Sequence, residues 1–466
     1  MSSEDRIVVE EPKEKPEKSK RILQIQDLPL PRRLIHTIEQ FISDLESIKE
    51  MFEVVIPVLK QKDELRKNQI NELFSSLDSF LKNDDNQDDN EKKEKFVLEL
   101  IELLPTLRKL NRADLMFRQN ALVMLVSRYD EFLAGVLEII FRANPDRLKS
   151  VDKTLTYEEI LQLGSIEEAL TKFVSKEVDK ILREAHADHI RYIDKQLKLN
   201  IEQQIIYWPD LIELTERRNL FVHTGGRVSQ QYIRACKSNN IKLEPKIEEN
   251  KILSVNEEYF KNAYKCLFEI GIKVSQSVYR KLFPNELAEA EHSLNLTIGI
   301  RLLEREQWEL ANIVFDYALS IPVKLLFSDY DHKVYTINKC IALKWSGAED
   351  KMNELLDSID WGAYHPKFLL AVRVLKDEYD EAENIMTKMG DQYILEGEYK
   401  GWPLFRDFRR SEQFRRAFKS IFKKDYQVEI LEDAILLAEQ EHEILVEADG
   451  EVVTNIEKPM EVEELK

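Results

Sequence analysis

Apolar residues recur three and four positions apart along most of this chain, the pattern that places them on one side of an amphipathic helix. One stripe covers about 31–83, and a longer series covers about 94–285. The longer series predicts helices at 121–141 (part of a long first helix), 166–184, 187–199, from about Trp208, and 256–283. No stretch bounded by turns alternates strictly between apolar and polar residues, so we expect an all-α protein without a sheet.

The segment after Pro284 predicts pairs of short helices. At Leu303–Ala311 and again at Leu375–Ala382, a helix end is followed by a short turn with an aromatic residue and by a small residue in the next helix. Leu343–Gly347 is a poorer copy, 40 residues after the first and 32 before the second. These separations are close to the period of tetratricopeptide (TPR) hairpins, which the segment resembles. An irregular helical bundle is the alternative interpretation.

Charged and polar runs divide the chain further. The run Asp84–Asn90 is the clearest boundary, and residues 1–27 are charged and contain no aromatic side chain. The predicted parts are a disordered charged arm (1–30), an N-terminal helical segment with its acidic linker (31–93), a first helical domain (94–285), a helical-repeat region (286–425) and an acidic tail (426–466).

The net charge of −19 is unevenly distributed. Residues 429–466 hold 13 acidic side chains against two lysines, whereas 405–425 hold eight basic side chains against three acidic ones. Because local patches matter more than the total, the acidic balance does not exclude nucleic acid as a partner.

Cysteine usage and hydropathy indicate the compartment. Three well-separated cysteines without a C-x-x-C spacing are typical of reduced thiols in a cytoplasmic protein. The N-terminus lacks the pattern of a secretory signal, and no apolar run approaches the roughly 18 residues of a spanning helix. We therefore expect a cytoplasmic protein that makes no membrane contact.

The most informative motif is Arg218–His223, followed closely by two glycines. Successive helical residues are rotated by about 100°, so Asn219 and His223 share a face with Arg218 at its edge. Gly225 or Gly226 is expected to take a positive φ and end the helix. The guanidinium stays charged and the imidazole titrates near neutral pH, so this set of side chains suits work on a phosphate.

The pattern Arg218-Asn219-x-x-x-His223, late in a helical bundle, resembles the HEPN superfamily, whose members carry R-x(4–6)-H. The resemblance covers about 94–285. It implies a metal-independent endoribonuclease without a cofactor, in which two copies of the motif meet across a homodimer. His223 would handle the proton of the ribose 2′-hydroxyl or of the leaving group, Arg218 would hold the scissile phosphate, and Asn219 would orient either one.

The resemblance also implies a toxin–antitoxin or antiviral defence effector that acts on RNA. The C-terminal helical repeats would then offer a surface to a regulatory or antitoxin protein. Two alternatives remain open: a non-catalytic helical adaptor that binds protein partners through its HEPN-like and TPR-like surfaces, and a toxin silenced by nucleotidyl transfer from a partner.

The two adjacent arginines are predicted to differ, because one helical step turns a side chain by about 100°. We expect Arg218 to face the cleft and Arg217 to be a dispensable exposed charge. The plainer interpretation of the motif is a surface ion pair of its arginine with Glu213 or Glu216, and a His223 that interacts with the last carbonyls of the helix.

Four further arginines are candidate RNA contacts: Arg227, Arg234, Arg409 and Arg410. The last two lie among phenylalanines between 405 and 422, a combination that suits single-stranded RNA. The near-helical spacing of those phenylalanines favours a buried stripe with a solvated basic face instead.

His186 and His189 are the one candidate pair of metal ligands, at a spacing that can share a helix face. A third ligand at a suitable spacing is missing from the sequence. We therefore predict solvated surface histidines and no metal site.

Overall fold

The computed structural model describes residues 28–82, 89–148, 165–245 and 247–426. Within these ranges the protein is all-α, as predicted, with one isolated antiparallel β-bridge between Arg227 and Ile252. None of these helices combines the length and apolarity that a membrane crossing requires. Nearly all of the predicted charged arm and acidic tail, and most of the acidic linker, lie outside the described residues.

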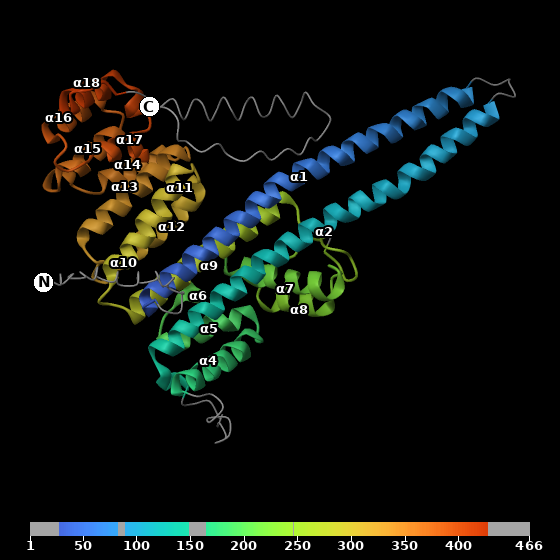
Figure 1. Cartoon of the computed structure of the whole chain (residues 1–466), viewed down its shortest axis with the longest axis horizontal. Helices are drawn as coiled ribbons and strands as arrows, with labels where there is room; N and C mark the ends of the chain where they lie inside the picture. Colours follow the sequence, from blue (N-terminus) through green and yellow to red (C-terminus); the bar gives the residue numbers. More distant parts are fainter. Residues whose placement is uncertain (1–27, 83–88, 149–164, 246, 427–466) are drawn as a thin grey trace, which may run out of the picture. The chain divides into compact units, whose positions relative to one another are not determined.

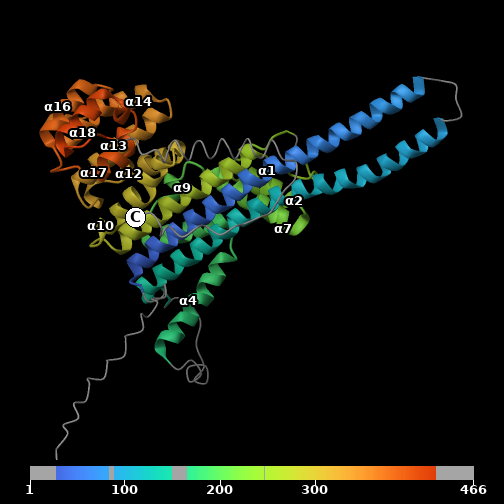
Figure 2. The same ribbon diagram turned by 45° about the horizontal axis from the view of Figure 1, so that its top comes forward.

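Helices α1 (Leu30–Lys82) and α2 (Asp89–Ala143) form an antiparallel hairpin (Figures 1 and 2). The sequence predicted α1 as a separate segment, but it shares a core with α2 and with α9 (Glu257–Leu282). Phe41 stacks on Phe132 with ring centroids 4.7 Å apart, and Phe52 stacks on Phe260 at 3.8 Å. The acidic linker therefore joins two packed helices of one unit rather than two domains.

The predicted helices of the first domain are confirmed, with small changes at their ends. They are α4 (Ile166–Leu182), α5 (His186–Leu197), α7 (Trp208–Thr224) and α9, with short α6 (Ile201–Gln204) and α8 (Gln230–Ser238) between them. Local signals explain the ends: the Ser165 side chain caps α4 and the Asn256 side chain caps α9. Gly225 ends α7 in the left-handed conformation at φ 61°.

Two compact units divide between Met352 and Asn353, inside α14 (Glu349–Asp357), and not near residue 285 as predicted. The reason is that the helices directly after α9 pack back onto it. Lys265 on α9, for example, pairs with Glu309 on α12 (Trp308–Ser320) at 2.6 Å.

The helix pairs predicted after Pro284 are present and share one type of turn. Glu306, Gly347 and Asp377 each take φ between 57° and 76°. The next N–H donates to the carbonyl five residues back, as in a Schellman motif, at 2.8–2.9 Å. These turns join α11 (Arg301–Glu304) to α12, α13 (Asp329–Trp345) to α14, and α15 (Pro366–Leu375) to α16 (Tyr379–Met389). The likeness to tetratricopeptide repeats stays a prediction.

The remaining elements are short, apart from α18. They are η2 (Pro145–Leu148), α10 (Leu287–His292), the π-helical η3 (Ser293–Ile300), η4 (Val323–Leu325), η5 (Trp361–Ala363), α17 (Glu396–Gly401), η6 (Pro403–Phe405), η7 (Phe408–Arg410) and α18 (Glu412–Phe422). Across η6, η7 and α18 the buried phenylalanine stripe is confirmed at Phe405, Phe408, Phe414 and Phe418.

The contact between α1 and α9 leaves no room at Gly271. A Cβ added there would lie 2.6 Å from Cε1 of Phe41, whose side chain is buried. We expect Gly271→Val to lower the free energy of unfolding by about 1–3 kcal/mol through overpacking, measured by urea denaturation. Gly397→Ala is the control, because nothing lies within 4 Å of its added Cβ. A Gly271→Val variant as stable as the control would contradict this packing.

Candidate functional site

A buried carboxylate fixes the rotation of α7. Glu213 accepts from Arg217 at 2.7 Å, from the Tyr232 hydroxyl at 2.6 Å and from the Tyr259 hydroxyl at 2.5 Å. The Arg217 guanidinium also donates to the carbonyl of Ser254 at 3.0 Å and lies 3.9 Å from the centroid of the Tyr259 ring. Burial raises the pKa of both tyrosines, so they remain neutral donors.

This network corrects the prediction for Arg217. Arg217 is only 8% exposed, so it is a buried structural cation and not a dispensable surface charge. Arg218 makes none of these contacts, so the two adjacent arginines do lie in different surroundings, whereas a catalytic role for Arg218 stays a prediction. Glu213 is the partner of Arg217 and not of Arg218, and the pair is buried rather than at the surface.

Arg218 belongs to a second polar group, the Asp130 cluster, which consists of Asp130 on α2, His186 on α5, and Arg218 and Asn219 on α7. The Asp130 carboxylate pairs with Arg218 through one oxygen and lies 2.8 Å from Nε2 of His186 through the other. Nη1 of Arg218 donates to Oδ1 of Asn219 at 3.2 Å, and its Nη2 lies 3.5 Å from Nε2 of His186. Three helices therefore bring an imidazole, a guanidinium, an amide and one carboxylate together.

Solvent reaches this cluster only in part. The side chains of Asp130, Arg218 and His186 are 30%, 18% and 10% exposed. A hydrogen bond between Asp130 and Nε2–H of His186 would leave a lone pair on Nδ1, which can act as a base. A carboxylate that holds an imidazole in one orientation is a recurring arrangement at acid–base sites.

His189 is fully buried next to the cluster, with its ring centroid 5.2 Å from that of His186. Its Nε2 is 3.1 Å from the carbonyl oxygen of Glu184, and its Nδ1 has no hydrogen-bond partner. Burial, followed by the charge of His186, lowers the pKa of His189 to about 4. Burial also raises the pKa of the nearby Glu216 carboxyl. The prediction that His186 and His189 are solvated surface histidines is therefore wrong.

His223 makes no hydrogen bond or ion pair with this cluster among the described residues. It is exposed in the last turn of α7. The structure thus brings two of the three predicted catalytic residues together, and His186 supplies the imidazole beside them.

The predicted RNA contacts have different surroundings. Arg227 and Arg234 are exposed, and Arg227 donates to the carbonyl of Asn250 at 3.1 Å. Arg409 is held by the carbonyl of Trp402 at 3.0 Å, which indicates a structural role, whereas Arg410 is largely exposed. These last two belong to the second unit.

Asp130 and His186 were missed as site residues. Asp130 lies beside the buried Tyr129 and between two other charged residues of α2, Arg128 and Glu131, so its position gives only a weak signal for a polar site. His186 was noticed only for its spacing to His189. Its contact with Asp130 joins residues 56 positions apart, which periodicity does not reveal.

In the parts of the chain that the structure describes, no group of three or more His, Cys, Asp or Glu side chains is placed to hold a metal ion. No family model, curated protein or solved structure matches the chain. The resemblance to the HEPN superfamily rests on the motif and its setting in the chain.

The Glu213 network generates a stability prediction. Arg217→Ala removes a buried cation from its carboxylate, so we expect a loss of about 3 kcal/mol in the free energy of unfolding, measured by urea denaturation. Arg218→Ala should cost clearly less, since Arg218 is partly solvated and Asp130 keeps access to water. Equal losses in the two variants would show that Arg217 is not the structural cation.

His189 generates a pH prediction. Its pKa in the folded protein, about 4, lies below the unfolded value of about 6.5. The unfolded state therefore binds the proton more readily in this window, and stability falls as the pH falls through it. We expect His189 to contribute a loss of about 2 kcal/mol between pH 7 and pH 5.

The measurement is the free energy of unfolding at both pH values. His189→Leu should remove most of this loss, whereas replacing the exposed His223 by leucine should leave it unchanged. The same pH dependence in wild type and His189→Leu would rule out His189 as its source.

Proposed function

We propose that this chain is a metal-independent endoribonuclease that attacks the phosphate of RNA with the neighbouring 2′-hydroxyl. The observation that supports this proposal is the Asp130 cluster. One carboxylate there contacts both an imidazole and a guanidinium, and these lie within 3.5 Å of each other beside the amide of Asn219. RNA as the substrate is taken from the resemblance of the α7 motif.

In the proposed reaction, Nδ1 of His186 takes the 2′-hydroxyl proton, and Asp130 keeps the ring oriented and offsets the charge that it gains. The 2′-oxygen then bonds to phosphorus, the bond from phosphorus to the 5′-oxygen breaks, and a 2′,3′-cyclic phosphate forms. Arg218 stabilises the negative charge on the phosphate, with Asn219 as a second polar contact. The 5′-oxygen needs a proton, for which His223 is the candidate donor.

Asp130 limits how tightly a phosphate can bind. Arg218 already contacts Asp130 and Asn219, and its Nε is buried without a partner, so the guanidinium must hold the phosphate with its other N–H groups. Since the carboxylate also repels the phosphate, substrate affinity must come from outside the cluster. The exposed Arg227 and Arg234 suit that role.

The working form in this proposal is a homodimer that brings two copies of the motif together, with a regulatory or antitoxin protein on the C-terminal helix pairs. A cytoplasmic location is proposed with it. All three cysteines are free and buried, which is compatible with a reducing compartment.

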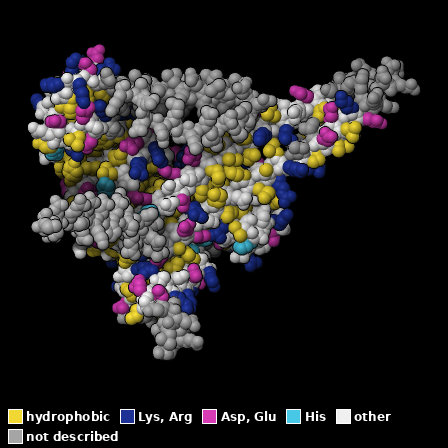
Figure 3. Space-filling view, in the orientation of Figure 1, with side chains coloured by type: hydrophobic (Ala, Val, Ile, Leu, Met, Phe, Trp, Pro, Cys, Tyr) yellow, Lys and Arg dark blue, Asp and Glu magenta, His cyan; other side chains and the backbone are white. Residues whose placement is uncertain are grey.

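A second candidate function is a non-catalytic adaptor. The outer halves of α1 and α2 project as an arm with apolar side chains between charged ones (Figures 1 and 3). Exposed large apolar residues on these two helices include Val54, Val58, Leu65, Phe74, Val97, Leu98, Ile101, Leu104 and Met116. A surface of this kind favours protein binding.

Incubation of the purified protein with total RNA in EDTA separates the two candidates. We expect cleavage that leaves 2′,3′-cyclic phosphate ends. Arg218→Ala and His186→Gln should each lower the rate by about 10²–10³-fold without loss of helix content, because each removes one stabilising or proton-transferring group. Specific activity should rise with protein concentration if the dimer is the active form.

Arg301→Ala is the matched control, since it removes an exposed arginine from α11, which has no part in the proposed site, and should change the rate only slightly. If His223→Ala lost activity while His186→Gln kept full activity, the general base would be His223 and not His186. Wild-type protein that cleaves no RNA over a wide range of concentrations would favour the adaptor.

A further inference from the structure

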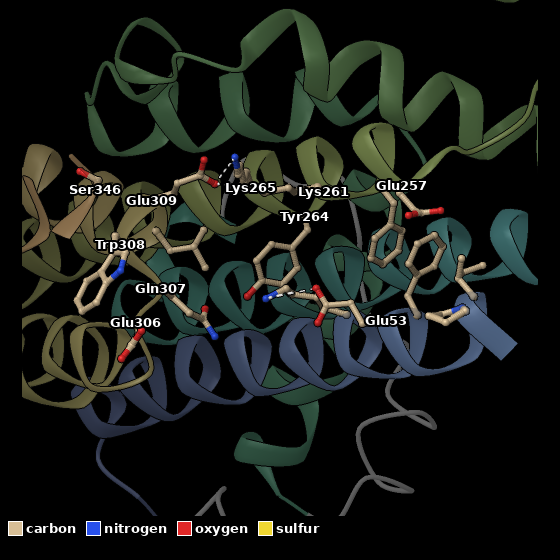
Figure 4. Close-up of a pocket in the computed structure, with 16 residues that line it drawn as sticks. Glu53, Glu257, Lys261, Tyr264, Lys265, Glu306, Gln307, Trp308, Glu309 and Ser346 are labelled. Atoms are coloured by element: carbon tan, nitrogen blue, oxygen red, sulfur yellow. Dashed lines mark ion pairs between the residues drawn. The ribbon is translucent and has the colours of Figure 1, made fainter. Parts of the chain in front are cut away.

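A cavity of about 740 Å³ lies between α1, α9 and the start of α12 (Figure 4). Its apolar lining comes from Phe52, Ile56, Phe260 and Leu310, all of which are buried. The rings of Phe52 and Phe260 stack in parallel within this lining, with centroids 3.8 Å apart. This volume is within the range of small-molecule sites, and none of the lining residues belongs to the Asp130 cluster.

Two polar atoms in the wall of this cavity are buried and have no hydrogen-bond partner. They are the hydroxyl of Tyr264, whose side chain is 2% exposed, and Oε1 of Gln307. Tyr264 comes from α9 and Gln307 from the turn before α12, and both are among the side chains around the cavity in Figure 4. An unsatisfied buried polar group destabilises the protein. A ligand that supplies a hydrogen-bond partner to either atom therefore gains binding free energy.

The hydrogen-bonding capacity of the two groups is defined. Burial raises the pKa of Tyr264, so its hydroxyl is neutral and can donate. The carbonyl oxygen of Gln307 can only accept. A ligand that satisfies both must carry an acceptor and a donor, or one hydroxyl group, at the same edge.

The charges around the cavity are paired. Lys49 lies 3.7 Å from Glu53, and Glu309 accepts from Lys261 at 3.1 Å and from Lys265 at 2.6 Å. The hydrogen bond from Lys265 holds the pKa of Glu309 below its usual value, so this carboxylate stays charged at neutral pH. An anionic ligand would have to compete with Glu53 and Glu309 for these lysines.

We propose that this cavity binds an uncharged aromatic ring compound that has one polar edge. The ring packs among the apolar side chains of the lining, and the polar edge bonds to Tyr264 and Gln307. The paired lysines make charged compounds poor ligands for the same site.

The test compares three probes on the full-length protein by equilibrium dialysis: 2-naphthol, naphthalene and 2-naphthoate. We expect 2-naphthol to bind with a Kd on the order of 10⁻⁴ M. It should bind about 3- to 10-fold more tightly than naphthalene, the gain typical of a hydrogen bond to a neutral group, and more tightly than the charged 2-naphthoate.

The variants assign this gain to named atoms. Tyr264→Phe should reduce the preference for 2-naphthol over naphthalene by about threefold, and adding Gln307→Leu should bring the two affinities to about the same value. Tyr393→Phe makes the same change at an exposed tyrosine and should leave the preference intact. Circular dichroism verifies that each variant is folded.

Three results would overturn the proposal. They are equal binding of naphthalene and 2-naphthol to wild type, tighter binding of 2-naphthoate than of 2-naphthol, and a preference for 2-naphthol that survives in the double variant. Failure of 2-naphthol to bind at about 1 mM, well above the expected Kd, would also overturn it. The result does not depend on RNA cleavage, so failure here and failure of the proposed enzyme activity are separate outcomes.

Discussion

The buried pair of Glu213 and Arg217 is the constraint on which the candidate site depends. A carboxylate without water must be surrounded by donors, and here one guanidinium and two tyrosine hydroxyls supply them. This requirement sets the rotation of α7 about its axis. Since Arg218 follows Arg217 by one helical step of about 100°, fixing Arg217 inward directs Arg218 and Asn219 toward α2 and α5.

Glu213 and Asp130 each contact an arginine of α7, and their surroundings contrast. Glu213 is 9% exposed and accepts hydrogen bonds from three donors of the protein, so its carboxylate has no need of a further partner. Asp130 is about one-third exposed, and its partners are the imidazole of His186 and the guanidinium of Arg218, which retains unused N–H groups. The more exposed pair, Asp130 with Arg218, can exchange a contact within the protein for one with a substrate. We therefore base the proposed RNA cleavage on Asp130 and not on Glu213.

Local signals in the sequence were sufficient for α7 and for the helix pairs near the C-terminus. Trp208 and Gly225 mark the ends of α7, and the repeated turns at Glu306, Gly347 and Asp377 mark the pairs. The rotation of α7 was not predictable in the same way, because the other donors to Glu213 lie 19 and 46 residues away. Arg217 therefore had the local signature of a surface charge, although the fold buries it.

The same limit explains the errors at α1 and at His186. An acidic polar run is compatible with a linker between domains and with the connection of a helical hairpin, and only the packing of Phe41 and Phe52 distinguishes the two. His186 changes the argument for a dimer as well. From the sequence, one motif offered one imidazole, so symmetry was needed to supply a second. With His186 beside Arg218 in the same chain, a dimer is required only if the proton donor for the leaving group comes from another copy.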